Sequence, residues 1–299
     1  METQKNKVDQ FVPMKHLMKG IGLSLFAWFA STIMVLLARY AQTSISLPMV
    51  LFFQNGIGLI AILPFAIKSH PKLARRVPYG TLIIRCLFGQ SAVLFQFLSV
   101  NFLDLTKTML FTNTAPILLP FIGFIWLRNK IKPLVFPGII IGFIGIYLIL
   151  RPSSLMVSGL GEIYGMSSGV CLSMVMLSLR LLAFLIKSEV ILFYFFLSGT
   201  ILFGIISCFF WKALTLILIV VLVSIGLFNL LGQYCISKSY QYGETSQLSP
   251  FSYSVIVYAL ILDWILYKSI PDKVSIIGMI LICIGGVCTI ILTTRKSNP

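Results

Sequence analysis

Long apolar runs, separated by short polar breaks, follow one another along almost the entire chain. A helix needs about 20 mostly apolar residues to cross the hydrocarbon core of a bilayer. Measured against that length, the pattern predicts ten spanning helices, at residues 17–38, 46–67, 79–100, 104–127, 133–150, 160–184, 189–210, 214–236, 244–267 and 274–293. The breaks carry turn and charge signals, such as HPKLARRVP before the third span and KSIPDK before the tenth.

The second half of the chain matches the first at a shift of about 140 residues. LFQFLS aligns with LGQYCIS, which places Gln96 opposite Gln233. A later match pairs glycines, which we expect to allow close helix packing: Gly138 with Gly278, and Gly145 with Gly285. Because each copy holds five spans, an odd number, the second copy enters the membrane in the opposite orientation, as in many secondary transporters.

The predicted fold class is therefore an all-α integral membrane protein, with ten transmembrane helices arranged as two inverted five-helix repeats. The predicted organisation is an N-terminal tail (1–16), a first repeat (17–150), a second repeat (160–293) and a C-terminal tail (294–299).

Composition and charge agree with a membrane protein. Hydrophobic residues make up 58% of the 299 residues and charged residues 10%, against about a quarter charged in soluble domains. The net charge of +15 comes from lysines and arginines in the breaks rather than along one helix face, which argues against nucleic-acid binding. With the N-terminus inside, cytoplasmic segments hold 15 of these 23 residues, the opposite side 6 and the spans 2. The positive-inside rule thus predicts cytoplasmic tails in the inner (cytoplasmic) cell membrane.

The sequence lacks the motifs of common enzyme and metal chemistry. It contains no GxxxxGK[ST] phosphate loop and no HExxH pair. The two histidines fall in predicted loops, and the six cysteines fall inside apolar runs without metal-ligand spacing. We therefore expect neither an enzyme nor a cofactor or metal.

Two stretches resemble a known family. RCLFGQSAVLFQFLSVNFLDLTKTMLFTNTAP resembles the third and fourth helices of the drug/metabolite transporter superfamily, EamA type. SYQYGETSQLSPFSYSVIVYALILDWILYKSIPD resembles the ninth-helix signature of that family, and the resemblance extends over residues 17–293. It implies a ten-helix exporter or exchanger whose central cavity is formed mainly by helices 1, 3, 4, 6, 8 and 9. The chain departs from the Gly-Glu pairs that the family carries at the ends of helices 4 and 9: Asn129 and Ser269 replace the acids, and Asp263 replaces one glycine.

Polar side chains at membrane depth are costly, so they face protein or a water-filled cavity. The polar candidates for substrate binding are Gln90, Gln96, Asn113, Asn229, Gln233, Ser249 and Tyr253, and the aromatic candidates are Trp28, Tyr164 and again Tyr253. The alternative is that each of them makes a hydrogen bond between helices, worth about 0.6 kcal/mol on average in membranes. Arg85 and Arg180 lie near cytoplasmic ends of spans and are expected to extend to the interface; the alternative is that they meet a substrate anion.

These features favour a secondary transporter of a small amphipathic metabolite. The expected cavity is neutral, amide-bearing and aromatic, which suits an amino acid, a nucleoside-like compound such as S-adenosylmethionine, or an organic cation. The alternative is a membrane-embedded scaffold or lipid-modifying enzyme. The expected partners are the small-molecule substrate and membrane lipid, with no nucleic acid, and the chain is expected to be a monomer or weak homo-oligomer.

Overall fold

The computed structural model describes residues 14–69, 78–127, 136–150, 159–182, 185–242, 248–268 and 272–294. Within these ranges every regular element is helical and no strand is present. The helices up to residue 150 are α2 (Met14–Ala41), α3 (Leu47–Ser69), α4 (Tyr79–Ser99), α5 (Leu105–Thr112), α6 (Ala115–Leu127) and α7 (Phe136–Leu150). Those from residue 160 onward are α8 (Leu160–Leu182), α9 (Ser188–Ser207), η3 (Cys208–Phe210), α10 (Leu216–Tyr242), η4 (Ser249–Tyr253), α12 (Ser254–Tyr267) and α13 (Lys273–Thr294).

Helices are found at every apolar run, with two irregularities that follow from proline. The predicted span at 104–127 is two helices, because Pro116 lacks the N–H that would continue α5 and instead occupies the second position of α6. Asn113 Nδ2 donates to Met109 O at 2.9 Å and Thr114 Oγ1 to Phe111 O at 2.8 Å, so side chains satisfy carbonyls at the break. Within the described part of the ninth predicted span, the 3-10 helix η4 precedes α12 and has a proline in its first turn.

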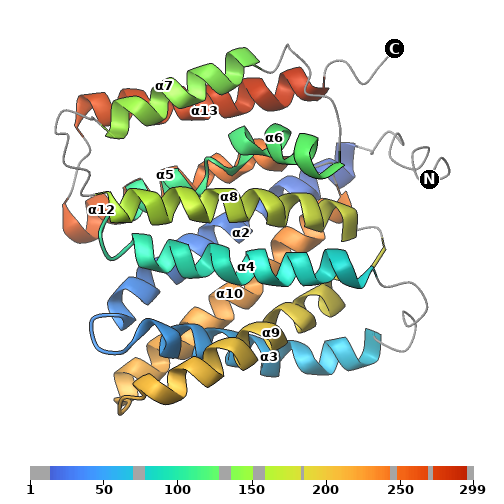
Figure 1. The fold of residues 1–299 in the computed structure, drawn as a ribbon, viewed down its shortest axis with the longest axis vertical. Helices are drawn as coiled ribbons and strands as arrows, with labels where there is room; N and C mark the ends of the chain where they lie inside the picture. The colour runs from blue at the N-terminus through green and yellow to red at the C-terminus, as the bar shows by residue number, and fades with distance from the viewer. Residues whose placement is uncertain are drawn as a thin grey trace.

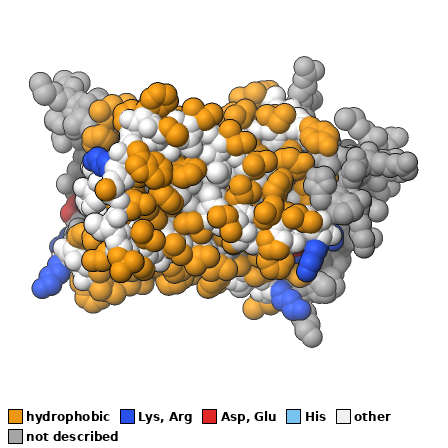
Figure 2. Space-filling view, turned by 90° about the horizontal axis from the view of Figure 1, so that it is seen from below, with side chains coloured by type: hydrophobic (Ala, Val, Ile, Leu, Met, Phe, Trp, Pro, Cys, Tyr) orange, Lys and Arg blue, Asp and Glu red, His pale blue; other side chains and the backbone are white. Residues whose placement is uncertain are grey.

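Six helical segments of the described chain are long and apolar enough to cross a membrane: α2, α3, α4, α8, α9 together with η3, and α10. Shorter apolar helices accompany them. Figure 2 shows that the visible face is covered broadly by apolar side chains, with lysine and arginine at its two ends. Such a surface fits a lipid environment, where charged side chains are confined to the water interfaces. The protein is a multi-pass membrane protein.

The main helix pairs each join one helix from before residue 151 to one from after it. The pairs are α2 with α10, α4 with α8, α3 with α9, and α7 with α13. Figure 1 shows the helices running roughly alongside one another, with α2 beginning and α13 ending on the same side of the bundle. Two of these pairs, α2–α10 and α4–α8, enclose the interior that contains the candidate site.

Glycines bring α7 and α13 into backbone contact. A Cβ atom placed on Gly285 would lie 2.5 Å from Gly142 N and 2.6 Å from Gly138 O. Because real Cβ atoms do not approach backbone atoms so closely, only glycine permits this spacing, as in small-residue helix interfaces of membrane proteins. The expectation that Gly138 and Gly285 serve helix packing agrees with these distances.

Candidate functional site

A central cavity lies between α2, α4, α8 and α10, with Thr112 reaching it from the end of α5. Its wall is formed by Ala27, Trp28, Ser31, Met34, Arg85, Gly89, Ala92, Val93, Gln96, Thr112, Ser168, Leu172, Val175, Met176, Leu179, Phe228, Asn229, Gly232, Gln233, Ile236 and Tyr240. The centres of water-sized molecules have about 80 Å³ to occupy there, several times the roughly 10–15 Å³ that one water requires. The cavity therefore has room for several waters or a small solute.

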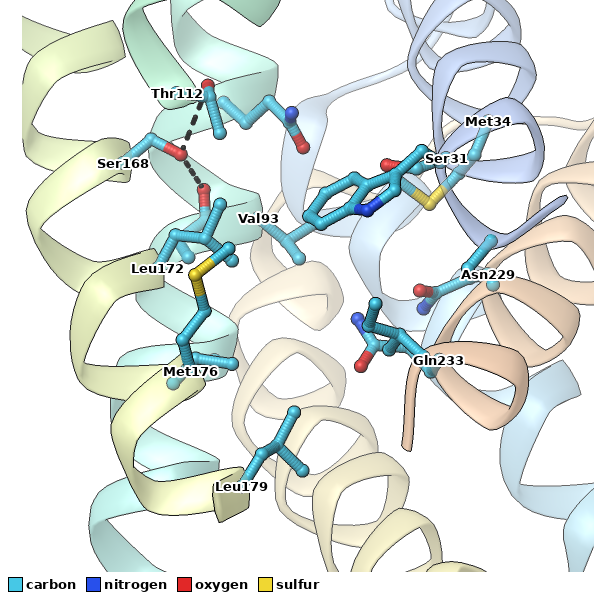
Figure 3. Close-up of a pocket in the computed structure, with 18 of the residues that line it drawn as sticks. Ser31, Met34, Val93, Thr112, Ser168, Leu172, Met176, Leu179, Asn229 and Gln233 are labelled. Atoms are coloured by element: carbon cyan, nitrogen blue, oxygen red, sulfur yellow. Dashed lines mark hydrogen bonds between the residues drawn. The ribbon is translucent and has the colours of Figure 1, made fainter. Parts of the chain in front are cut away.

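Helical periodicity explains why these positions meet. The lining residues of α4 fall at positions 85, 89, 92, 93 and 96, which is the i, i+4, i+7, i+8, i+11 pattern of one helix face. On α10, Asn229 and Gln233 are one turn apart, and Figure 3 shows both side chains on the same side of the cavity. Figure 3 also shows Ser31 and Met34 of α2 on the opposite side from Ser168, Leu172 and Met176 of α8.

Arg85 is fully buried in the wall of the cavity, with none of its surface exposed. Its Nη2 donates to Gln233 Oε1 at 2.7 Å, and its guanidinium carbon lies 4.8 Å from the centre of the Phe195 ring. Its Nε and Nη1 have no hydrogen-bond partner among the described residues. A Cβ on Gly89 would collide with Arg85 Nη1 and with the Phe195 ring, so glycine at this position provides the space for the guanidinium.

The burial of Arg85 corrects the expectation that its side chain extends to the interface. Arg85 lies six residues after the start of α4, about 9 Å along the axis, a depth from which a long side chain can reach water. It turns inward instead, because Gln233 and Phe195 bind the guanidinium across the helix interface. Arg180, by contrast, is exposed. The cavity is therefore cationic rather than neutral as expected, since Arg85 is the charged residue among its described lining residues.

Two more polar side chains in the wall have donors without partners. Trp28 is 9% exposed and Asn229 is 3% exposed, and neither Trp28 Nε1 nor Asn229 Nδ2 makes a hydrogen bond to a described residue. In the described lining residues, four buried polar side-chain atoms lack a hydrogen-bond partner: Trp28 Nε1, Asn229 Nδ2, and Nε and Nη1 of Arg85. All of these buried atoms are N–H donors.

The hydroxyl groups of Ser168 and Thr112 in the cavity wall make hydrogen bonds within the protein. Ser168 Oγ donates to Ala92 O at 2.8 Å and accepts from Thr112 Oγ1 at 3.4 Å, as Figure 3 shows with dashed lines. The amide of Gln96 makes a single long contact, from Nε2 to Met109 Sδ at 3.5 Å. Sulfur is a weak acceptor, so the Gln96 amide keeps most of its hydrogen-bonding capacity.

Four of the nine predicted site residues line the cavity, namely Trp28, Gln96, Asn229 and Gln233. Gln90 lies elsewhere, where its Nε2 donates to Asn55 Oδ1 at 2.9 Å and to Phe195 O at 2.8 Å. Those bonds are the interhelical type that was the alternative to substrate binding.

Three more of the predicted residues, Asn113, Tyr164 and Tyr253, are also outside the described cavity wall. Asn113 bonds within its own helix, and the ring of Tyr164 stacks on that of Phe95 with centroids 6.3 Å apart. Tyr253 is buried in the helix core, with a hydroxyl that has no hydrogen-bond partner. The side chain of Ser249 lies outside the described part, as do residues Asn129 and Ser269.

A second buried polar contact closes the bundle at the end far from Arg85. Asp263 of α12 is 3% exposed, although the sequence places it near a span end accessible to water. Its Oδ2 accepts from the backbone N of Thr106 at 2.8 Å and from Thr106 Oγ1 at 2.6 Å, while Oδ1 has no partner. The Arg39 guanidinium lies 5.0 Å from the centre of the Tyr267 ring at the same end. These contacts join α2 and α5 to α12.

The described residues hold no group of histidines, cysteines or acids arranged to bind a metal ion. A catalytic pair is likewise not built around the cavity, because its described wall contains no acid, histidine or cysteine. The chemistry available there is non-covalent binding by donors, one cation and apolar surface.

Comparison with known proteins gives the family context. The sequence pattern of the EamA-like transporter family matches residues 18–151 and again residues 159–291. The chain is 22% identical to a pseudopaline exporter of Pseudomonas aeruginosa over 94% of this chain and 98% of that protein. It is 25% identical to an uncharacterised transporter of Helicobacter pylori over 89% of this chain and 93% of that one. A solved crystal structure superposes with a TM-score of 0.66 at 17% identity, over 94% of this chain and 99% of the other, which supports the fold alone.

Proposed function

Because this chain belongs to the EamA-like transporter family, and is a membrane transporter rather than an enzyme, we propose that it is a secondary transporter. In this proposal it moves a small amphipathic metabolite across the cytoplasmic membrane by alternating access. The substrate classes to be tested are amino acids, nucleoside-like compounds such as S-adenosylmethionine, and organic cations. A relative named as an exporter supports transport out of the cell.

The observation that carries the proposal is the central cavity. It lies inside a bundle whose outer surface is apolar, and two helices from each half of the chain enclose it. Its wall carries a buried arginine and amides that a protein interior would ordinarily pair. Such a wall is expensive to maintain unless a polar solute or water occupies it, which fits the midplane site of a transporter.

The arrangement of helices supports two inverted repeats with ten spans, at 17–150 and 160–293. If the two halves are exchanged, α2 takes the place of α8 and α4 takes the place of α10, so the pair α2–α10 becomes the pair α8–α4. The pairs α3–α9 and α7–α13 are unchanged by the exchange. The family pattern also matches the chain twice, over nearly the same two segments. Two similar halves of opposite orientation can exchange an inward-open form with an outward-open one.

The two ends of the cavity differ in a way that supports this cycle. The contact of Asp263 with Thr106 joins the halves at one end, while the lining extends to Leu179 and Tyr240 near the ends of α8 and α10 at the other. If the basic loops and both tails are cytoplasmic, the closed end faces outward. The described conformation then corresponds to an outward-closed state of the carrier.

Solute flux tests the proposal. Liposomes that contain the purified protein are loaded with labelled L-amino acids, S-adenosylmethionine and tetraethylammonium. The release of each compound is compared with its release from protein-free liposomes. A Ser31→Trp variant places a large ring in the cavity wall and is expected to reduce flux at least tenfold. Ile60→Trp is the matched control, because Ile60 is 75% exposed on the outer face of α3, and it is expected to transport normally.

Two results would contradict the proposal. One is a wild-type protein that inserts and folds but releases none of the compounds faster than protein-free liposomes. The other is equal flux through Ser31→Trp and wild type, which would separate any solute movement from the central cavity.

A further inference from the structure

Arg85 is a buried cation without a counter-ion among the described residues. Five acids lie in the described part of the chain: Asp104, Glu162, Glu189, Asp263 and Asp272. None of them lines the cavity, and none forms an ion pair with Arg85. A charge in a membrane interior is ordinarily paired, because an isolated charge is costly in a medium of low dielectric constant.

Two of these acids, the buried Asp263 and the partly buried Glu189, are already engaged elsewhere. Asp263 accepts two hydrogen bonds from Thr106 at the far end of the bundle. Glu189 lies 3.6 Å from Lys238 Nζ and accepts from Tyr234 Oη at 3.4 Å. Neither acid can neutralise Arg85 without losing these contacts. The counter-charge is therefore more readily supplied by the solute that enters the cavity.

The remaining contacts of Arg85 hold the guanidinium in place but do not neutralise it. Gln233 provides one neutral acceptor, and the face of the Phe195 ring provides a cation–π contact. Two of the three guanidinium nitrogens keep free N–H groups. Guanidinium presents donors in a planar arrangement that matches a carboxylate, which accepts two parallel hydrogen bonds.

The other unpaired atoms in the wall select for the same kind of group. Trp28 Nε1 and Asn229 Nδ2 are further donors without acceptors. An anionic group rich in acceptors would satisfy these donors and the charge together. An organic cation would leave all the donors unpaired and would be repelled by Arg85.

We infer that the substrate carries a carboxylate and that Arg85 binds this group in the central cavity, with Gln233 and Phe195 positioning the guanidinium. The inference rests on the proposed function and narrows it: among the three substrate classes it selects amino acids and other compounds with a free carboxylate.

Matched pairs of compounds test the inference without any mutation. Liposomes containing the protein are loaded with a mixture of carboxylates and their carboxamides, such as L-phenylalanine with L-phenylalaninamide and L-methionine with L-methioninamide, together with S-adenosylmethionine and tetraethylammonium. Mass spectrometry follows release of each compound. The expected result is release of one or more carboxylates at least tenfold faster than the corresponding carboxamide and than tetraethylammonium, since hydrogen bonds to a charged group are worth this factor or more.

Three variants connect that selectivity to Arg85. Arg85→Met is expected to abolish the preference for the carboxylate, and Arg85→Lys to keep part of it, because lysine retains the charge but not the planar donors. Arg180→Met is the control, since Arg180 is an exposed arginine of a spanning helix. Without substrate, Arg85→Met should unfold at the same temperature as wild type or higher, because an unpaired buried charge has been removed. A purely structural arginine would instead lower the unfolding temperature.

The outcomes separate the two levels of the argument. Release of carboxamides or tetraethylammonium in preference to carboxylates, or an unchanged carboxylate preference in Arg85→Met, overturns the inference and leaves the transporter function standing. Absence of release of every compound through the wild type, or release that Ser31→Trp does not reduce, contradicts the proposed function and the inference with it.

Discussion

The contact of Thr106 with Asp263 should set how readily the bundle opens at its closed end. A Thr106→Val variant removes the hydroxyl that donates to Asp263 Oδ2 at 2.6 Å, and keeps the backbone N–H bond of 2.8 Å to the same oxygen. Valine has nearly the same shape, so packing around the buried position changes little. Thr106→Ser keeps the hydroxyl and is the matched control.

The size of the effect follows from the charge of the acceptor. A hydrogen bond to an ionised group contributes about 1.5–3 kcal/mol. Asp263 Oδ1 accepts no hydrogen bond from a described residue, so the other carboxylate oxygen does not compensate for the loss of the Thr106 hydroxyl. If the bond exists only in the closed form, its removal shifts the ratio of closed to open molecules by roughly 10- to 150-fold. Opening of this end should therefore become correspondingly more frequent in Thr106→Val.

Hydrogen–deuterium exchange of the protein in lipid nanodiscs measures that opening. Peptides covering α5 and α12 should exchange faster by a factor in this range in Thr106→Val, while peptides from α3 and α9 exchange as in wild type. Thr106→Ser should behave like wild type. Equal exchange of α5 in all three proteins would refute the reasoning, and a uniform increase in every helix would indicate general destabilisation instead of opening at one end.

Three further predictions address the cavity, the packing and the topology. Gln96→Ala and Gln233→Ala should each reduce flux severalfold, as expected for about 1 kcal/mol of hydrogen bonding; Gln96→Ala should leave the unfolding temperature unchanged, because its one contact, to sulfur at 3.5 Å, is weak. Gly285→Val should destabilise the protein by about 1–3 kcal/mol in thermal unfolding through overpacking, whereas Gly123→Val should not, because a Cβ added there would contact no other part of the protein within 4 Å. A Lys72→Cys variant should resist labelling by an impermeant maleimide added outside intact cells, and labelling there would reverse the assigned orientation.

The helices were predictable from sequence because the bilayer fixes the length of an apolar run. The break at Pro116 is explained by local chemistry, since a missing N–H interrupts a helix wherever it occurs. The pairing of helices is only partly encoded in such local signals. The glycines of α7 and α13 were interpretable as packing residues because few other roles suit them in an apolar helix.

The site was less predictable because polarity does not say which neighbour a side chain meets. Gln90 and Gln96 are both amides of α4, but Gln90 lies about 140° around the helix from Arg85, and Gln96 about 20°. The helical angle therefore distinguishes the residue facing α3 and α9 from the one facing the cavity. The inward direction of Arg85 depends on Phe195 and Gln233, which are more than 100 positions away in the sequence, so distance along α4 alone gave the wrong direction.

The unpaired guanidinium of Arg85 gives the empty carrier and the loaded carrier different responses to voltage. On the carboxylate proposal, the empty carrier carries one positive charge within the membrane and the loaded carrier carries none at that position. Moving one elementary charge across a membrane potential of 100 mV changes its energy by about 2.3 kcal/mol. For a solute of net charge −1, a negative cell interior would then draw the unoccupied site toward the cytoplasm after each release and leave the outward step of the loaded site unaffected, whereas a zwitterionic amino acid would leave the net charge of the site unchanged. The resting potential would in this way favour export of an anionic solute without a coupling ion.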